Sequence, residues 1–448
     1  MNSIKIAVVG SGISGLSAAW LLSQRHTVTL IEAENRLGGH SNTVDCKTKE
    51  GLVPIDTGFI VYNCATYPNL VALFDYLNVP TARSNMGFSV SLNGGASEYA
   101  GDSLLQMFGN AGNLVSLQHW RMLWDITRFF RTALGQSRHL PENVTLGQFF
   151  KDQSYSRAFM DRHLLPMAGA IWSSEPHHMI DFPARSFLRF FDNHGLLRFT
   201  NRPQWRTVVG GSRAYVERLT ADGRFETRLG CRVHKIDRLA KGVVVHGNEG
   251  FRQEFDQVVI ATHADQALAM LGTPFARERK FLRAFRYARN RAVLHRDRAL
   301  MPRRSRLWSS WNYATENADP HQPSSVTYWM NALQPLATST DFFVSLNPRR
   351  EPAADLTERE FSYDHPMFTS ETAKLQESMW CLQGQHRTWY CGAHFGVGFH
   401  EDGLQAGLAV AEQLGDVMRP WNLPNPSSRI NVARPYTVLE TAPLEAAE

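Results

Sequence analysis

The sequence predicts an α/β fold in which a domain with a parallel sheet is assembled from separated stretches of the chain and carries an inserted α+β domain. At 448 residues the chain is too long for one ordinary core, so two domains are expected. An unbroken apolar run at residues 4–9 has the character of a buried parallel strand, and residues 13–23 have the composition of a helix. Strand and helix patterns of the same kind return at residues 205–265 and 385–420.

The turn between the first predicted strand and helix carries three glycines, Gly10, Gly12 and Gly15. In a Rossmann turn the first glycine permits the tight bend, the second lets the backbone approach a pyrophosphate, and the third lets the helix pack on the strand. Free NH groups at the start of the helix, including those of Ile13 and Ser14, attract phosphates together with the helix dipole. The turn therefore predicts a dinucleotide site, although a packed turn without a ligand would show the same glycines.

A carboxylate follows the second predicted strand. Residues 27–31 form another apolar run, and Glu32 ends it about 20 residues beyond the first glycine. At this spacing a carboxylate accepts hydrogen bonds from an adenosine ribose and repels a 2′-phosphate. Strand, turn, helix and carboxylate together favour the dinucleotide interpretation.

The composition excludes several other classes of protein. The net charge is +5, and no zinc-ligand spacing, RNA-binding signature or helix-turn-helix pattern accompanies it, so no nucleic-acid partner is expected. The five cysteines are scattered and form no CxxC pair, which is typical of a reducing compartment. No apolar run of about 18 residues is present, so we expect a cytoplasmic protein without a membrane span. The histidines show no metal-ligand spacing, and no metal is expected.

A glycine pair follows the second predicted strand and extends the pattern. Residues 36–40, with Arg36, Gly38, Gly39 and His40, resemble the RxGGR element of the flavin-containing amine-oxidase superfamily, which also includes protoporphyrinogen oxidases and carotenoid desaturases. The resemblance implies that Arg36 and the backbone of the two glycines support the pyrophosphate of FAD. His40 departs from the usual second arginine, so it is expected to bind a phosphate, to pack, or to attach the flavin covalently.

Two later stretches resemble the same superfamily. Residues 231–236 are similar to the strand whose valine pairs with the adenine, which implies that role for Val233. Residues 390–407 are similar to the C-terminal flavin motif. Three residues of this motif are expected at the cofactor: Gly392, Asp402 and Leu404. The motif implies that its acidic residue contacts the ribityl chain or the phosphates, and that the helix N-terminus stabilises the anionic reduced flavin.

The resemblance implies FAD as the cofactor and a division into domains. A glutathione-reductase-type FAD-binding Rossmann domain is expected at residues 1–85, 205–265 and 385–420, and an amine-oxidase-like α+β substrate domain at 86–204 and 266–384. The first insertion is mostly helical in pattern, whereas the second carries strand patterns separated by Pro, Asn and Asp. Residues 421–448 are expected to form an irregular tail.

Finer resemblance narrows the family. Residues 56–63 include Thr57 and Gly58 as expected cofactor contacts. With the segments at 167–173, 294–297, 308–313 and 398–403, they resemble a bacterial group of NAD/FAD-binding, amine-oxidase-like proteins often encoded beside cyclopropane-fatty-acyl synthases. The resemblance implies a dehydrogenase or desaturase that takes a hydride from a methyl-branched or unsaturated fatty-acyl chain of a lipid. It also suggests a cyclopropane-type methyltransferase as a partner.

An amine oxidase acting on a polyamine or another amine is the main alternative. Such an enzyme needs aromatic rings at the flavin and a nearby lysine, but the strand expected to carry that lysine starts near Asn290 and Arg291, and only Lys280 lies close in sequence. A flavin-bound accessory partner of a lipid methyltransferase is a second alternative, and a nicotinamide-dependent reductase is a third. No second GxGxxG unit is present, so oxygen, a quinone or another acceptor is expected to reoxidise the flavin.

Two stretches favour a lipid substrate. Residues 104–140 interleave Trp and Phe with arginine and fit either an interfacial helix or an amphipathic helix that caps the substrate domain. Residues 277–306 are dense in arginine and fit either a patch that docks on anionic headgroups or a solvated helix face with a hairpin. The membrane interpretation adds peripheral contact with the inner face of the membrane to the cytoplasmic location.

The base that would take a proton from the substrate is the least well defined part of the site. His394 is the first choice because the C-terminal motif implies a position close to the flavin, and Tyr328 and His295 follow. A histidine in a glycine-rich loop equally fits a packing residue or a hydrogen-bond partner of the flavin.

Overall fold

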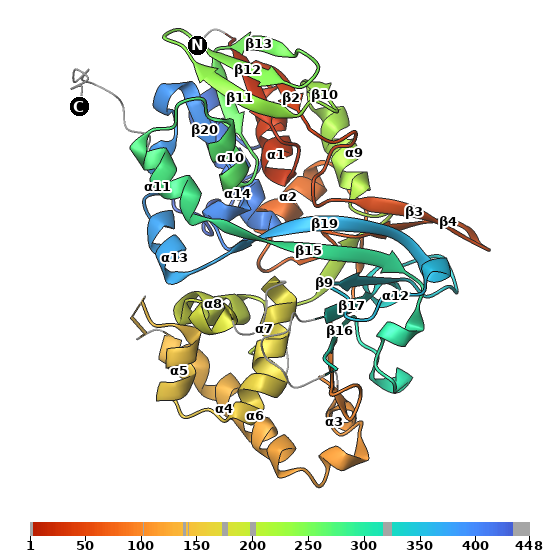
Figure 1. Cartoon of the computed structure of the whole chain (residues 1–448). Helices are drawn as coiled ribbons and strands as arrows, with labels where there is room; N and C mark the ends of the chain where they lie inside the picture. Colours follow the sequence, from red (N-terminus) through yellow and green to blue (C-terminus); the bar gives the residue numbers. More distant parts are fainter. Residues whose placement is uncertain are drawn as a thin grey trace.

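The structure is a computed structural model that describes residues 3–101, 103–137, 140–141, 143–172, 178–197, 203–316 and 325–432. The predicted tail beyond residue 432 and the end of the 167–173 segment lie outside the described residues. A parallel sheet and a mixed sheet organise two ends of the molecule, with the N-terminus at the end of the parallel sheet (Figure 1). Among the described residues, every helix is too short or too polar to cross a bilayer.

The first sheet is parallel throughout and has the strand order β10-β2-β1-β14-β20. Its strands are β1 (Lys5–Val9), β2 (Thr27–Ile31), β10 (Glu226–Arg228), β14 (Gln257–Ile260) and β20 (Thr388–Tyr390). Three separated stretches of the chain thus build one sheet, in which β1 lies between β2 and the much later β14. The apolar side chains of these three strands are buried, as expected for parallel strands covered on both faces.

Helices α1 (Ile13–Leu22) and α14 (His400–Gly415) pack side by side, and α1 lies against this sheet (Figure 1). A Cβ on Gly403 would lie 2.8 Å from Ser14 Oγ, and one on Gly407 would overlap the carbonyl oxygen of Ser14. The two glycines therefore allow a close contact, and the helices run parallel with their starts together.

An antiparallel sheet and further helices complete this end of the molecule. These elements are β11 (Val233–Arg238), β12 (Val243–Gly247), β13 (Arg252–Phe255), α2 (Pro68–Tyr76), α9 (Arg213–Asp222), α10 (Ala264–Met270), α11 (Ala276–Ala284) and α13 (Ser370–Gln376). Short pieces connect the two ends: β3 (Thr43–Thr48), β4 (Gly51–Asp56), β5 (Val61–Asn63), β6 (Thr81–Arg83), β9 (Trp205–Val208) and α12 (Met330–Leu333).

The second sheet is mixed, with the strand order β19-β15-β18-β17-β16-β7-β8. Its strands are β7 (Phe88–Leu92), β8 (Ser97–Ala100), β15 (Arg286–His295), β16 (Trp311–Ala314), β17 (Ser325–Trp329), β18 (Phe343–Leu346) and β19 (Thr357–Met367). Below β15 and β19 in Figure 1 lie α3 (Leu104–Met107), α4 (Leu117–Ser137), α5 (Leu146–Asp152), α6 (Arg157–Phe159), α7 (Leu165–Trp172) and α8 (Ala184–Asn193). The predicted α/β class with an inserted α+β domain is confirmed.

Two parts of the second domain differ from the sequence prediction. Residues 88–100, expected in a mostly helical stretch, form the hairpin β7–β8, which joins the sheet through β16. The basic stretch 277–306 forms α11 and then one long strand, β15, rather than a hairpin. β15 pairs with β18 on one side and with the edge strand β19 on the other. No sequence pattern predicted β19, because it alternates charged side chains with few apolar ones.

Candidate cofactor site

The glycine turn between β1 and α1 combines a tight bend with open space. Gly10 has φ = +98°, and a Cβ on it would lie 3.0 Å from the carbonyl oxygen of Ala261, so only glycine fits the bend. A Cβ on Gly15 would overlap the carbonyl oxygen of Gly10, so its absence lets α1 pack on β1. Gly12 has φ = −61°, and a Cβ on it would meet no atom within 4 Å. The turn therefore leaves open space at Gly12 for an anionic group, beside the first backbone NH groups of α1.

Glu32 holds this turn from the side. Its Oε2 accepts hydrogen bonds from the backbone NH of Ser11 (2.8 Å) and from the Ser11 hydroxyl (2.6 Å), and its Oε1 accepts one from the NH of Glu34 (2.9 Å). The NH of Cys231 donates to the Glu32 carbonyl at 2.8 Å, and the buried Val233 heads β11 two residues later. Glu32 and the segment that leads into β11 thus lie together at one side of the turn, the arrangement that an adenosine site needs.

The Gly38-Gly39 loop packs directly on the first turn. The NH of Gly38 donates to the carbonyl of Ser11 at 3.1 Å, and a Cβ on Gly39 would lie 3.1 Å from Gly12 Cα. Arg36 pairs with Glu34 through Nη2 at 2.9 Å, whereas its Nη1 is buried without a partner among the described residues. A buried guanidinium NH without an acceptor is costly, so this atom fits a bound anion such as a phosphate.

His40, where the superfamily carries an arginine, belongs to a group of half-buried histidines. Its ring centroid lies 5.4 Å from that of His365, 6.4 Å from that of His263 and 5.0 Å from that of Tyr363. Burial, and then the neighbouring His365, His263 and His400, hold the pKa of His40 well below its usual value. Burial also lowers the pKa of His365 to about 4 and that of His400 to about 3. These rings are therefore neutral at pH 7.

Three ring nitrogens of this region are buried without a hydrogen-bond partner in the described part of the chain: His40 Nε2, His263 Nδ1 and His394 Nε2. His394 follows β20, and burial lowers its pKa to about 3. Unpaired buried polar atoms are rare in folded proteins, so these nitrogens indicate a ligand with polar groups. Among the described residues, no three His, Cys, Asp or Glu side chains gather as metal ligands.

Thr57 and Gly58 follow β4 and fix the backbone around His40. The Thr57 hydroxyl lies 2.7 Å from the Tyr363 hydroxyl and donates to the carbonyl of Asn42 at 3.1 Å. A Cβ on Gly58 would overlap the carbonyl oxygen of His40. Both residues therefore shape the histidine group, and the Thr57 side chain is occupied by protein partners.

Asp402 organises the loop that starts α14. Its buried carboxylate accepts hydrogen bonds from the NH of Val397 (3.1 Å) and of Phe399 (2.8 Å) and pairs with Arg429 at 2.6 Å. The carboxylate expected at the ribityl chain or the phosphates is thus turned toward its own loop. Leu404 is fully buried on the same helix. Gly392 precedes the short helical turn Ala393–Phe395, and a Cβ on it would lie 2.5 Å from the His394 ring.

Sequence analysis missed Arg429, which lies in the stretch expected to be irregular. Its guanidinium also donates to the carbonyl of Thr66 at 3.0 Å and lies 5.5 Å from the ring centroid of Tyr67. Asp402 raises the pKa of Arg429 against the opposing effect of burial. A single arginine in a stretch rich in Pro and Asn carries no periodicity or motif that would have identified it.

The other two base candidates lie in the second sheet. His295 Nε2 is 2.8 Å from the Ser345 hydroxyl, and its Nδ1 accepts a hydrogen bond from the NH of Asp297 at 3.1 Å. Tyr287 stacks on His263 at 4.3 Å and lies about eight residues before His295 on β15, so His295 is on the order of 25 Å from the histidine group. Tyr328 lies on β17, where its ring packs against Trp311 at 4.9 Å. The structure brings His394 to the histidine group and does not bring His295 there.

An aromatic wall, formed by Trp172, Phe190, His194 and Phe399, stands beside the start of α14. Phe399 stacks on Phe190 at 4.7 Å, and Phe190 lies 4.7 Å from Trp172 and 3.8 Å from His194. Burial lowers the pKa of His194 to about 3, so its ring is neutral. The wall joins two helices of the second domain to the loop of the first.

Comparison with known proteins defines the class of this protein. The family model for flavin containing amine oxidoreductases matches residues 13–294, and the chain belongs to this family. AofH of Mycobacterium tuberculosis, which carries the name of a flavin-containing monoamine oxidase, is 27% identical over 271 residues. These residues make up 58% of this chain and 57% of AofH, so the match spans little more than half of that relative.

Solved structures share the fold at low sequence identity. A CLA-producing fatty acid isomerase from P. acnes superposes with a TM-score of 0.66 at 16% identity, covering 92% of this chain and 98% of that chain. A putrescine oxidase bound to putrescine superposes with a TM-score of 0.64 at 15% identity, covering 92% and 99%. At these identities the likeness shows the fold alone.

FAD is therefore the cofactor, and the described residues fit it. The room at Gly12, the unpaired Nη1 of Arg36 and the unpaired nitrogens of the histidine group supply space, a cation and polar partners in one region. The parallel starts of α1 and α14 add two positive helix ends. When bound, FAD supplies an acceptor for two electrons and a proton.

The glycine turn yields a matched pair of variants. We expect Gly12→Ala to leave the melting temperature of the apoprotein unchanged and to weaken FAD binding about tenfold or more, because its Cβ meets no protein atom and fills the room for the pyrophosphate. Gly15→Ala should destabilise the apoprotein by about 3 kcal/mol, because its Cβ overlaps Gly10. Thermal unfolding and FAD titration measure both; equal FAD affinity in Gly12→Ala would contradict the assigned cradle.

The Arg429 pair yields a prediction about stability. Arg429→Met should lower the free energy of unfolding by about 3–5 kcal/mol, because it leaves the Asp402 carboxylate buried without its cation. The control is Arg25→Met, which breaks an exposed pair with Asp416 and should cost no more than about 1 kcal/mol. Denaturant unfolding measures both values, and equal losses would show that the loop does not depend on Arg429.

The neutral histidines predict a loss of stability in acid. Burial holds the pKa of His194, His394 and His400 at about 3, below the ordinary value of 6.5, so the unfolded chain binds more protons than the folded one. The free energy of unfolding should therefore fall as the pH drops from about 6.5 toward about 3, by about 1.4 kcal/mol per pH unit for each such ring. In denaturant unfolding of the apoprotein, His394→Asn should reduce this pH dependence by the contribution of one ring, about 1.4 kcal/mol per pH unit. The matched control is His234→Asn, on an exposed ring of β11.

Proposed function

We propose that this protein is an FAD-dependent dehydrogenase or desaturase that acts on a methyl-branched or unsaturated fatty-acyl chain of a lipid. The aromatic wall carries the proposal, because it is apolar and its one titratable ring, His194, is neutral. Acyl chains bind to such apolar and aromatic surfaces. The guanidinium of Arg429, 5.9 Å from the ring centroid of Phe399, is paired with the Asp402 carboxylate, so this pair offers a substrate ammonium group no unpaired carboxylate.

The strand β15 supports the same substrate class. An amine oxidase would carry a lysine near Asn290, and the ten residues of β15 include no lysine. The Asn290 amide instead donates to the ring Nδ1 of His365 at 2.9 Å and accepts a hydrogen bond from Asn347 at 2.7 Å. A neutral amide held by neutral partners suits an uncharged substrate.

His394 is the base that we propose. Bound FAD supplies the acceptor for a hydride from a carbon that is allylic or next to a methyl branch. A proton leaves the neighbouring carbon at the same time, so the substrate loses two hydrogens and gains one double bond. His394 suits this proton because its ring is neutral and its Nε2 is buried without a partner among the described residues.

The structural relatives support both substrate classes on this fold, since one is a fatty acid isomerase and another a putrescine oxidase. The choice between an acyl chain and an amine as substrate therefore depends on the side chains of this protein that would surround the substrate. A methyl-branched acyl chain would come from a methyltransferase that alkylates a double bond, so we propose a cyclopropane-type methyltransferase as the partner that supplies the substrate.

Anaerobic mixing tests the proposal directly. Phospholipids with methyl-branched or unsaturated chains should bleach the flavin absorbance at about 450 nm. Mass spectrometry should show that the lipid has lost two hydrogens. Phe190→Asn should slow this reaction about tenfold or more, whereas Phe190→Leu, which removes the ring but stays apolar, should change it much less.

Putrescine and other polyamines are the second substrate set. If they bleach the flavin and the lipids do not, the protein is an amine oxidase and the lipid proposal is wrong. If neither substrate reacts but the activity of the co-expressed methyltransferase depends on this protein, the accessory role replaces it.

A further inference from the structure

We propose that the end of the molecule formed by α3 and the start of α4 docks on an anionic lipid bilayer. Six large apolar side chains are exposed there: Leu105 (87%), Leu114 (53%), Val115 (86%), Leu117 (86%), Trp120 (50%) and Trp124 (65%). We call this set the apolar tip. Leu134, farther along α4, is less exposed (37%), and exposed apolar side chains such as Leu52 and Met418 come from separate elements. Clustered exposure of this kind marks an interaction site.

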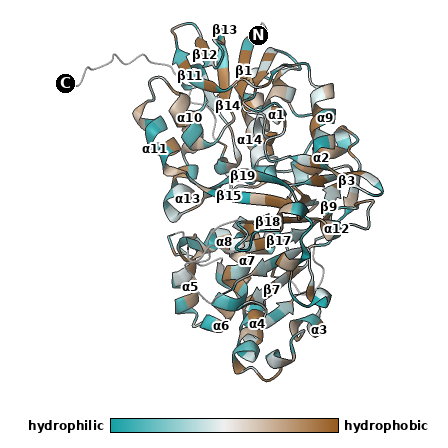
Figure 2. Ribbon diagram, turned by 45° about the vertical axis from the view of Figure 1, so that its right-hand side comes forward, coloured by the Kyte–Doolittle hydropathy of each residue, from teal (hydrophilic) through white to brown (hydrophobic). Residues whose placement is uncertain are grey.

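The apolar tip is one continuous surface. The indole NH of Trp120 donates to the carbonyl of Leu114 at 2.8 Å, which folds the loop before α4 onto the helix. The ring of Phe108, just after α3, lies 5.1 Å from the ring of Trp120. Leu117, Trp120 and Trp124 follow the spacing of one helix face. In Figures 1 and 2, α3 and α4 form the end of the molecule that lies opposite β11–β13.

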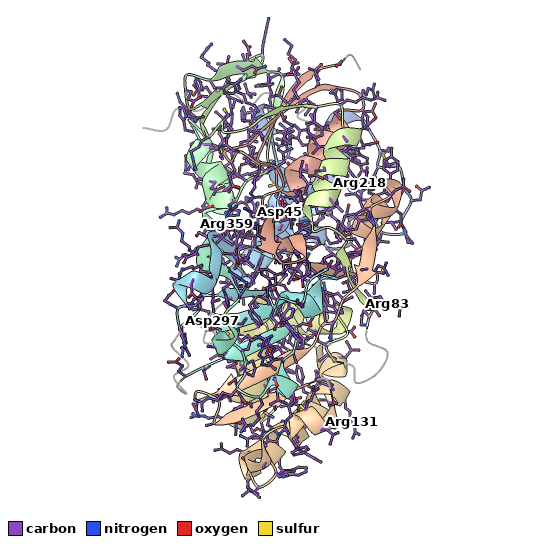
Figure 3. All side chains as sticks on the ribbon, turned by 90° about the vertical axis from the view of Figure 1, so that its right-hand side faces the viewer. Asp45, Arg83, Arg131, Arg218, Asp297 and Arg359 are labelled. Carbon is purple, nitrogen blue, oxygen red and sulfur yellow. The ribbon has the colours of Figure 1, made fainter. Side chains whose placement is uncertain are left out.

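Arginines border the apolar tip. Arg121 and Arg131 are exposed on α4, and Figure 3 shows Arg131 toward this end of the molecule. Arg303 and Arg306 are exposed nearby, where Arg306 donates to the carbonyl of Gly109 at 2.6 Å.

Two acidic side chains of this region are buried and already paired. Asp125 contacts Arg128 at 3.0 Å and the exposed Arg121 at 3.6 Å, and Glu98 contacts Arg304 at 2.6 Å. The tip therefore presents apolar side chains within a basic rim, the combination that binds acyl chains and anionic headgroups together.

The charge of the rim favours a bilayer over a second copy of the chain. A twofold interface would place the same patch against itself, so the arginines of both copies would meet with like charge. Anionic headgroups would neutralise them.

Most of the basic stretch 277–306 lies outside this surface. On β15 and after it, Arg291 pairs with Glu351 and Glu360, and Arg298 pairs with Asp341. The end of the stretch, at Arg303 and Arg306, is the part that borders the tip. Docking goes beyond the proposed function, because it needs no turnover and no particular substrate.

Vesicle flotation of the FAD-loaded protein tests the docking. The protein should float with vesicles of phosphatidylglycerol and phosphatidylcholine and remain behind with phosphatidylcholine alone. Trp120→Ser combined with Trp124→Ser should reduce partitioning about tenfold or more, and Arg121→Gln with Arg131→Glu about tenfold. These side chains are exposed, so the flavin spectrum should confirm intact folding of each variant.

Control variants away from the apolar tip test whether the loss of vesicle binding is specific to the tip. Leu52→Gln, at an exposed leucine on β4, and Arg283→Glu with Arg286→Glu, at and after the end of α11, should float like the parent protein. The proposal is wrong if the parent does not float, if the controls lose binding equally, or if the tip variants instead dissociate an oligomer in sedimentation. Flotation of an enzyme that oxidises only polyamines would keep the docking and reject the lipid substrate.

Discussion

The cofactor site depends on the close packing of α1 against α14. Gly403 and Gly407 bring the later helix against Ser14, and this contact holds together two loops that come from opposite ends of the sequence. Because both helices begin at the same edge of the parallel sheet, their positive ends converge on one region. A larger side chain at either glycine would separate the pyrophosphate turn from the flavin loop. The relative position of these two loops is therefore fixed by backbone packing at the glycines.

The second property of the site is that its histidine group carries no charge. His40 stands at the second arginine position of the RxGGR element, and its ring is neutral like those of His365 and His400. The positive potential for an anionic reduced flavin therefore comes from helix ends and from Arg36 rather than from this position. The Asp402–Arg429 pair is internally balanced. Neutral histidine rings and an aromatic wall together form an environment that suits the binding of an uncharged acyl chain.

The sequence predicted the first domain better than the second for a physical reason. Strands buried on both faces, such as β1 and β2, leave unbroken apolar runs that are visible in the sequence alone. The pairing of β15 with β19 is held partly by ion pairs such as Arg291–Glu360, which join residues far apart in the chain and leave no local pattern. In the site, the glycines and Glu32 belong to one local turn and were predictable. His365 and Arg429 reach it from unrelated segments without a motif.

The strand order of the parallel sheet has a consequence for biosynthesis. β1 and α1 are synthesised long before their partners β14 and α14, and His26 contacts Gly415 across 389 positions. A nascent chain thus exposes the apolar surface of its first βαβ unit while the second domain is still being made, a situation that favours chaperone binding. The cofactor cradle is complete only when α14 and Arg429 have been synthesised, so FAD meets its full set of contacts only after these late segments are made.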